Sequence, residues 1–184
     1  MQLDPNPALI VIDLQKGVVA AAPPPAAEVI TRASHLARAF RERGLPVVLV
    51  NVAGRAPGRT DAGPPKMSFP PDWTDLVPEL DPQSSDYLVT KHRFSAFIGT
   101  KLDVYLRQHG VTQIVLAGIS TSIGVESTAR NAFDLDYNVA FVTDAMTDRD
   151  PDNHRHSIEK IFPRLGESFR TDDVLTMLRS KNPQ

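Results

Sequence analysis

The chain has 184 residues, of which 41% are hydrophobic and 23% charged, and its formal net charge is −2. This length fits one globular domain over residues 1–184, and the small negative charge argues against nucleic acid or an anionic membrane as the main partner. The absence of cysteine excludes disulfides, thiolate metal sites and a cysteine nucleophile.

The first predicted strand ends in an acidic residue. Ala8–Asp13 is an apolar run that finishes with a carboxylate, and Gln15 follows two residues later. This pattern is typical of a buried parallel strand whose last side chain reaches the ligand-binding edge of a sheet. Because a strand-end Asp can equally cap the following turn, this position alone leaves both interpretations open.

A helix and a second strand follow. Residues 18–27 are rich in alanine and proline and predict a rigid loop. An apolar stripe at helical spacing predicts a helix from Ala26 to Arg43, and Pro46–Val52 predicts the second strand.

The segment 53–85 is a long loop rich in proline and glycine. A loop of this length inside a compact domain is usually functional or mobile. Arg55 and Arg59 could bind an anionic substrate or simply face water, and Trp73 could anchor a lid or only pack.

The third predicted strand, Asp86–Lys91, ends in a cation where the first ended in an anion. Residues 92–97 lead into an amphipathic helix over about Thr100–His109.

The centre of the chain has the pattern of a strand, a turn, a helix and a second strand. These elements are expected at Gln113–Ala117, Gly118–Gly124, Val125–Leu135 and Asn138–Thr143. Such a βαβ unit places its strand-to-helix turn at the carboxyl edge of the sheet, where ligands of open α/β sheets bind. Residues 144–148 are polar and are expected to end the strand that begins at Asn138. After them the sequence predicts a helix over Asp152–Phe162, a strand near Ser168–Arg170 and a helix over Asp172–Arg179.

The predicted strand ends bring together residues that are distant in the sequence. Asp13, Lys91, Gly118 and Asp144 should lie on one edge of a doubly wound, mainly parallel sheet. Asp13 and Lys91 would then face the glycine turn, where a carboxyl beside an ammonium can donate or accept a proton. A purely structural ion pair explains the same two residues equally well.

These segments resemble those of a known family, the isochorismatase-like hydrolases of the cysteine hydrolase superfamily. The resemblance runs in order through Ala8–Gln15, Thr90–Phe97, Gly118–Ala129 and Asn138–Asp144. It implies a three-layer, Rossmann-like α/β/α fold with a six-stranded parallel sheet. It further implies that Asp13 is the acid/base residue, that Lys91 is its partner, and that the bond between Ile119 and Ser120 is cis.

The chain departs from the amide-hydrolysing members of this family at one position. Their motif places the nucleophilic cysteine where this sequence has Gly124, which has no side chain that could attack a substrate. True isochorismatases are similar in having glycine there. In their reaction, as the resemblance implies, an Asp protonates a vinyl ether carbon and water completes the hydrolysis, releasing pyruvate.

The same resemblance suggests which residues contact the substrate. Lys91 and Arg93 are candidates for binding a substrate carboxylate, and backbone N–H groups near Gly124 are candidates for an anion site. Further candidates for substrate contact are Gln15, Ile119, Ser120 and Ile123.

Three functions remain open on the sequence. The first is a cofactor-independent hydrolase that uses Asp13 and Lys91 without a covalent nucleophile, on a vinyl ether such as isochorismate or a related small carboxylic acid. The second is an inactive family member that binds a ligand or regulates, and the third is an amidohydrolase that uses water or a nearby serine.

No cofactor and no metal site are expected. His154 and His156 are two residues apart and would not share a helix face. The apolar runs have the length of strands, and residues 1–4 do not resemble a signal peptide, so we expect a cytoplasmic protein without a membrane partner. The family resemblance implies a homodimer or a higher homo-oligomer that acts on a small molecule.

Overall fold

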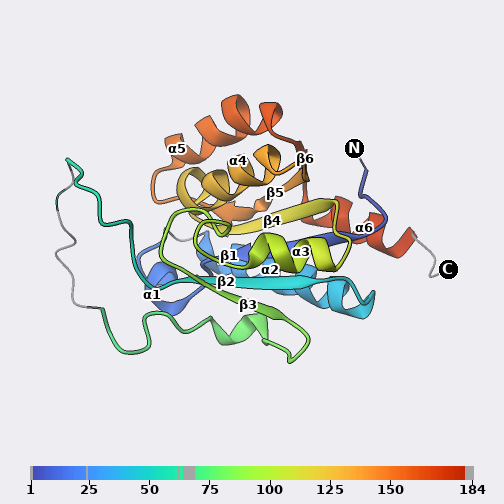
Figure 1. The fold of residues 1–184 in the computed structure, drawn as a ribbon, viewed down its shortest axis with the longest axis horizontal. Helices are drawn as coiled ribbons and strands as arrows, with labels where there is room; N and C mark the ends of the chain where they lie inside the picture. Colours follow the sequence, from blue (N-terminus) through green and yellow to red (C-terminus); the bar gives the residue numbers. More distant parts are fainter. Residues whose placement is uncertain (1, 24, 62, 64–68, 181–184) are drawn as a thin grey trace.

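A computed structural model describes residues 2–23, 25–61, 63 and 69–180 (Figure 1). Six strands form one sheet in the order β3-β2-β1-β4-β5-β6, and every pair of neighbours is parallel. The strands are β1 (Pro7–Ile12), β2 (Val47–Val52), β3 (Tyr87–Lys91), β4 (Gln113–Ile119), β5 (Asn138–Thr147) and β6 (Glu167–Phe169). The prediction of a mainly parallel, doubly wound sheet is therefore confirmed.

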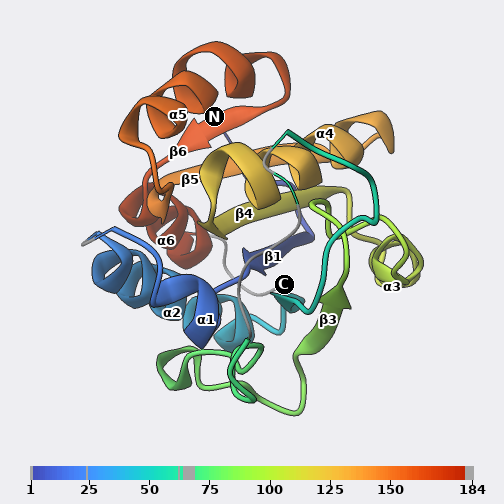
Figure 2. The same ribbon diagram turned by 90° about the vertical axis from the view of Figure 1, so that its left-hand side faces the viewer.

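Helices cover both faces of the sheet (Figures 1 and 2). The helices are α1 (Lys16–Val19), α2 (Ala26–Glu42), α3 (Leu102–Gln108), α4 (Glu126–Asp134), α5 (Pro151–His156) and α6 (Thr171–Ser180). Shorter helical turns are η1 (Pro78–Leu80), η2 (Thr121–Val125), η3 (Ser157–Ile161) and η4 (Phe162–Arg164). Among the described residues, no helix is long and apolar enough to cross a membrane.

The two faces of the sheet have separate cores because successive side chains of a strand point to opposite faces. Leu9 and Val11 of β1 pack with α2 and α6, including Phe40 and Val174. Ala8, Ile10 and Ile12 belong to the other core, which is built with the buried residues of α3, α4 and η4. All six residues of β1 are buried, which explains why a central parallel strand has a continuous apolar sequence.

The elements differ from the predictions mainly where helices begin. The turn predicted at Gly118–Gly124 includes the π-helical η2, which runs directly into α4. The helix predicted over Asp152–Phe162 starts one residue earlier, at Pro151, and continues as η3 and η4. A short helix, α1, follows β1 where no helix was predicted.

The strand β5 is longer than predicted and irregular. Leu116 pairs with Phe141 while Gly118 pairs with Met146, so the register shifts between these two points. Asp144 was expected at the end of this strand but lies inside the irregular stretch, and β5 continues to Thr147. The strand therefore delivers a later acidic residue, Asp148, to the carboxyl edge of the sheet.

Candidate active site

Asp13 and Lys91 form a buried ion pair at the carboxyl edge of the sheet. Asp13 follows β1 directly with a left-handed φ of +51°, and Lys91 is the last residue of β3. The Lys91 Nζ lies 2.7 Å from Asp13 Oδ2 and donates a second hydrogen bond to the Phe94 carbonyl at 2.9 Å. Since β2 lies between β1 and β3, this pair joins two strands that are not neighbours.

The second carboxylate oxygen of Asp13 is buried without a partner. Among the described residues, Oδ1 of Asp13 has no hydrogen-bond donor. Burial raises the pKa of Asp13 from 3.8 to about 6, although the neighbouring Lys91 opposes this rise. A carboxyl group with such a pKa and a free oxygen can give up and take back a proton near neutral pH.

Gly124 leaves a space beside this pair. A Cβ atom at this position would lie 3.3 Å from Asp13 Oδ2, 3.4 Å from Lys91 Nζ and 2.9 Å from Ile12 Cγ2. The turn that carries Gly124 follows β4, and the bond between Ile119 and Ser120 is cis, as the family resemblance implied. The structure thus brings together the three residues predicted to be catalytic, and their catalytic role stays a prediction.

Hydrogen bonds hold the turn in place from three directions. The N–H and the hydroxyl of Ser122 both donate to Asp148 Oδ2 at 2.8 Å. The hydroxyl of Thr128 donates to the Gly124 carbonyl at 2.7 Å, and Thr121 Oγ1 lies 2.8 Å from His154 Nδ1. The position of Gly124 is therefore fixed by the following helix and by the chain after β5.

A cavity of about 480 Å³ opens beside Asp13, Lys91 and Gly124. Ile119, Ser120 and Ile123, which were predicted to contact a substrate, line its wall. This edge of the sheet faces the viewer in Figure 2. The volume is sufficient for a small organic molecule.

The long loop contributes an aromatic wall to this cavity. Phe69 and Trp73 both line it, and their ring centroids lie 4.4 Å apart. Trp73 also packs on α1, since a Cβ atom at Gly17 would come within 1.9 Å of the indole ring. Of the two interpretations left open for Trp73, the structure thus supports a place at the site.

Two predicted substrate contacts, Gln15 and Arg93, do not line the cavity. The Gln15 side chain is fully buried and bonds only backbone groups, namely the N–H and carbonyl of Val52 and the carbonyl of Trp73. It therefore fixes the ends of two strands and the loop to one another. Arg93 instead donates to the carbonyl of its neighbour His92.

Three of the backbone N–H groups near Gly124, where an anion site was expected, have partners inside the protein. Ser122 N–H donates to Asp148, and the N–H groups of Ile123 and Val125 donate to the Ser120 carbonyl. These three donors are already used inside the protein and cannot bind a substrate anion. Arg55 and Arg59 are exposed and do not line the cavity, so the solvated interpretation fits them better.

Sequence reasoning missed a polar wall beyond β5. Asp148, Arg149, Asp150 and Asn153 all line the cavity, on the side opposite Lys91 in the strand order. Asp148 is only 4% exposed. The polar run at 144–148 was a signal for this wall, but the sequence analysis predicted that Asp144, and not Asp148, reaches the edge of the sheet.

The comparisons with known proteins agree with this fold. Residues 7–173 match the isochorismatase domain family. The chain is 41% identical over 179 residues to the uncharacterized isochorismatase family protein YwoC of Bacillus subtilis, covering 94% of each protein. It is 31% identical to the isochorismatase of the same species, with 96% of this chain matching 60% of that protein.

A solved structure supports the same assignment. The isochorismatase family protein from Burkholderia thailandensis superimposes with a TM-score of 0.92 at 41% identity, covering 97% of this chain and 98% of that one. Members of the family are hydrolases. On the match of sequence and fold together, the chain belongs to the isochorismatase family.

Proposed function

We propose that this protein is a hydrolase that works without a covalent nucleophile, with Asp13 as general acid and Lys91 as its partner. Its substrate would be a vinyl ether such as isochorismate, or a related small carboxylic acid. The observation that carries the proposal is the buried, unpartnered Oδ1 of Asp13, a residue that lines a cavity together with Lys91 and Gly124.

The reaction would begin with a proton transfer from Asp13. The protonated carboxyl adds its proton to the terminal vinyl carbon, and the ether carbon becomes an oxocarbenium ion. Water then adds to this cation and returns a proton to the Asp13 carboxylate. The resulting hemiketal breaks down to the alcohol and a keto compound, which is pyruvate when the substrate is isochorismate.

Lys91 and Gly124 would assist in different ways. The ammonium of Lys91 stabilises the Asp13 carboxylate that forms when the proton is donated and persists until water returns one, because it lies 2.7 Å from Oδ2. Gly124 leaves room beside both groups, where a side chain would contact them. The site therefore favours proton transfer over nucleophilic attack by the protein.

Amide hydrolysis through a nearby serine has less support. The Ser122 hydroxyl is held by Asp148, and Ser122 does not line the cavity. Ser120 lines the cavity, but no side chain that the structure describes forms a hydrogen bond with its hydroxyl and could act as a base. A pure binding function would not explain why a buried carboxylate oxygen of Asp13, Oδ1, has no hydrogen-bond partner among the described residues.

The test is pyruvate release from isochorismate and from simpler vinyl ethers, compared between the wild type and Asp13→Asn. General acid catalysis contributes about 10²- to 10⁴-fold, so we expect Asp13→Asn to lower kcat by at least about 100-fold. Asp144→Asn is the matched control, since that carboxylate faces α6, and it should retain the wild-type rate. Ligand binding without turnover would favour the binding function, and ammonia release from amides would favour an amidohydrolase.

A further inference from the structure

The cavity at the site has two charged ends. One end holds the pair of Asp13 and Lys91, and the other holds Asp148, Arg149 and Asn153, which follow β5. Between them lie apolar side chains, among them Ile119 and Ile123. A ligand that fills the cavity must therefore present an apolar middle and polar groups toward both ends.

Arg149 differs from the other charged residues that line this cavity. Lys91 is bound to Asp13, Asp148 accepts from Ser122, and the Asp150 carboxylate accepts from the Asp152 N–H at 2.8 Å. Arg149 is exposed like Arg55 and Arg59 but, unlike them, lines the cavity, and its guanidinium forms neither a hydrogen bond nor an ion pair with any residue in the described part of the chain. It is thus a cation at the cavity that can form a bidentate ion pair with an anionic ligand.

The charges of the lining residues limit the anion. Asp13, Asp148 and Asp150 are acidic, while Lys91 and Arg149 are basic, so the wall carries one more negative than positive charge when all are ionised. A compact dianion such as a phosphate monoester would place two negative charges against the one unpaired cation of this wall. A single carboxylate matches Arg149 without leaving a second charge uncompensated.

Asp148 and Asn153 define a second requirement. The Asp148 carboxylate is almost fully buried and lines the cavity, so a hydroxyl or N–H of the ligand that approaches it gains a charge-assisted hydrogen bond. Asn153 is exposed at the same wall and can donate or accept. Asp148 directly precedes Arg149 in the sequence, and Asn153 follows it by about one helical turn.

We infer that Arg149 is the specificity-determining residue of this site, and that it selects a small carboxylic acid carrying a hydroxyl or N–H donor over a neutral or phosphorylated analogue. The carboxylate pairs with Arg149, the donor group binds Asp148 or Asn153, and the apolar part lies across Ile119 and Ile123 toward Asp13. As a statement about the substrate class, this inference rests on the proposed function, and as a statement about binding it can be tested without turnover.

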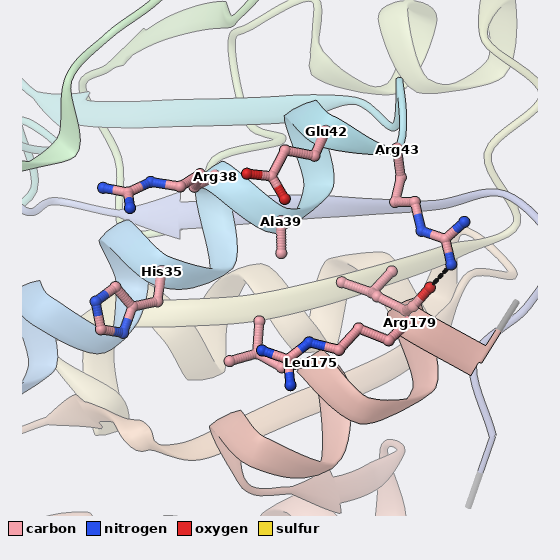
Figure 3. A pocket seen from close by; sticks show the side chains of 8 residues that line it. His35, Arg38, Ala39, Glu42, Arg43, Leu175 and Arg179 are labelled. Carbon is pink, nitrogen blue, oxygen red and sulfur yellow. Dashed lines mark hydrogen bonds between the residues drawn. The ribbon is translucent and has the colours of Figure 1, made fainter.

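A second basic cavity offers a rival place for an anion. It has a volume of about 360 Å³, lies between α2 and α6, and is lined by His35, Arg38, Arg43 and Arg179 among others (Figure 3). Arg43 donates there to the Leu178 carbonyl, and Glu42 supplies a negative charge to the same wall. Arg38 is exposed and has no partner among the described residues, which makes it the matched control for Arg149.

The experiment uses Trp73, the single tryptophan of the chain, as a reporter because it lines the cavity of Asp13 but not the one between α2 and α6. Its fluorescence is titrated with 3-hydroxybenzoate, 3-hydroxybenzamide and phenyl phosphate. We expect 3-hydroxybenzoate to bind most tightly. Its Kd should rise about 10- to 100-fold in Arg149→Gln, less in Arg149→Lys, and not at all in Arg38→Gln.

Several results would overturn the inference. These are equal binding by wild type and Arg149→Gln, loss of binding in Arg38→Gln, tighter binding of the amide or the phosphate, and no fluorescence change with any probe. Failure of the proposed function looks different, because carboxylate binding that depends on Arg149 would persist without hydrolysis. Conversely, hydrolysis that needs Asp13 but keeps its KM in Arg149→Gln would refute only the inference.

Discussion

Asp13 follows β1 and Asp144 lies within β5 of the same sheet, and the surroundings of the two carboxylates differ completely. Asp13 pairs with Lys91 through one oxygen and leaves the other buried and free. Asp144 uses both oxygens, since Oδ1 accepts from the N–H and hydroxyl of Thr171 at 2.8 and 2.9 Å, and Oδ2 lies 3.6 Å from Arg32 and 3.5 Å from Arg170. The first carboxylate keeps one oxygen without a partner, while both oxygens of the second bind neighbouring side chains or backbone.

The difference shows how the sheet separates the acid proposed to be functional from a structural one. Asp144 caps the first residue of α6 and ties that helix to β5, which stabilises the positive end of the helix dipole. Asp13 faces a cavity and is held in a left-handed conformation that is uncommon for residues other than glycine. Both acids were predicted at strand ends, but hydrogen-bond satisfaction and access to a cavity differ between them.

Removal of the Lys91 cation should have the largest effect on the surroundings of Asp13. Lys91→Met keeps the length of the side chain but leaves Asp13 as an unpaired buried charge. We expect the free energy of unfolding to fall by about 3–5 kcal/mol at pH 7 and kcat to fall about 100-fold. The loss of stability should shrink at pH 5, because a protonated Asp13 needs no counterion.

Urea unfolding and initial rates at both pH values measure this prediction. Lys101→Met is a suitable control, since Lys101 is exposed and precedes α3 without a partner among the described residues. Wild-type turnover in Lys91→Met would show that the ion pair is structural only.

The second-largest effect should be a pH dependence of catalysis that depends on Asp13 and not on Asp144. Because the pKa of Asp13 is raised from 3.8 to about 6, the acid form needed for proton donation disappears above about pH 6. We expect kcat/KM to fall about tenfold per pH unit above that value. The profile should be unchanged in Asp144→Asn.

The same raised pKa gives a signature in stability. Folded Asp13 holds its proton more tightly than the unfolded chain does, so its stabilising contribution is full below pH 3.8 and is lost as pH rises through about 6. The difference in free energy of unfolding between wild type and Asp13→Asn should therefore move against the wild type from pH 4 to pH 7. A difference that stays constant over this interval would contradict the raised pKa.

Much of the fold could be predicted because the buried strands leave a clear trace in the sequence. Ala8–Asp13 and Gln113–Ala117 are continuous apolar runs, as parallel strands covered on both faces must be. The meeting of Asp13 with Lys91 also followed from parallel strands, whose carboxyl ends share one edge. The cis bond before Ser120 came from the family resemblance, since nothing in the local composition indicates it.

The polar wall beyond β5 could not be predicted for a geometric reason. The register shift between Leu116 and Gly118 decides which residue of the following strand reaches the edge, and a bulge of this kind has no signal in apolar periodicity. The sequence therefore predicted Asp144 at the edge of the sheet, whereas the structure shows that Asp148 lines the cavity there. Gln15 was misassigned for a related reason, because sequence alone does not tell a buried amide that binds backbone from one that binds substrate.

The smallest effect should come from the structural carboxylate. Asp144→Ala removes the acceptor for the Thr171 N–H and hydroxyl, and we expect a loss of about 1–2 kcal/mol in the free energy of unfolding with kcat unchanged. Asp144→Asn should lose less, since an amide oxygen can still accept both hydrogen bonds. Arg170→Gln should cost under about 1 kcal/mol, because the arginine side chain is 70% exposed and its ion pair is screened.

Denaturant unfolding and kinetics on these three variants decide whether the contrast holds. A loss that grows from Arg170→Gln through Asp144→Asn to Asp144→Ala would assign most of the contribution of Asp144 to the helix cap rather than to its charge. A fall in kcat that exceeds the fraction of unfolded protein would mean that Asp144 reaches the chemistry through β5. In that case satisfied hydrogen bonds would no longer be a criterion for separating the two acids, and access to the cavity would be the only one left.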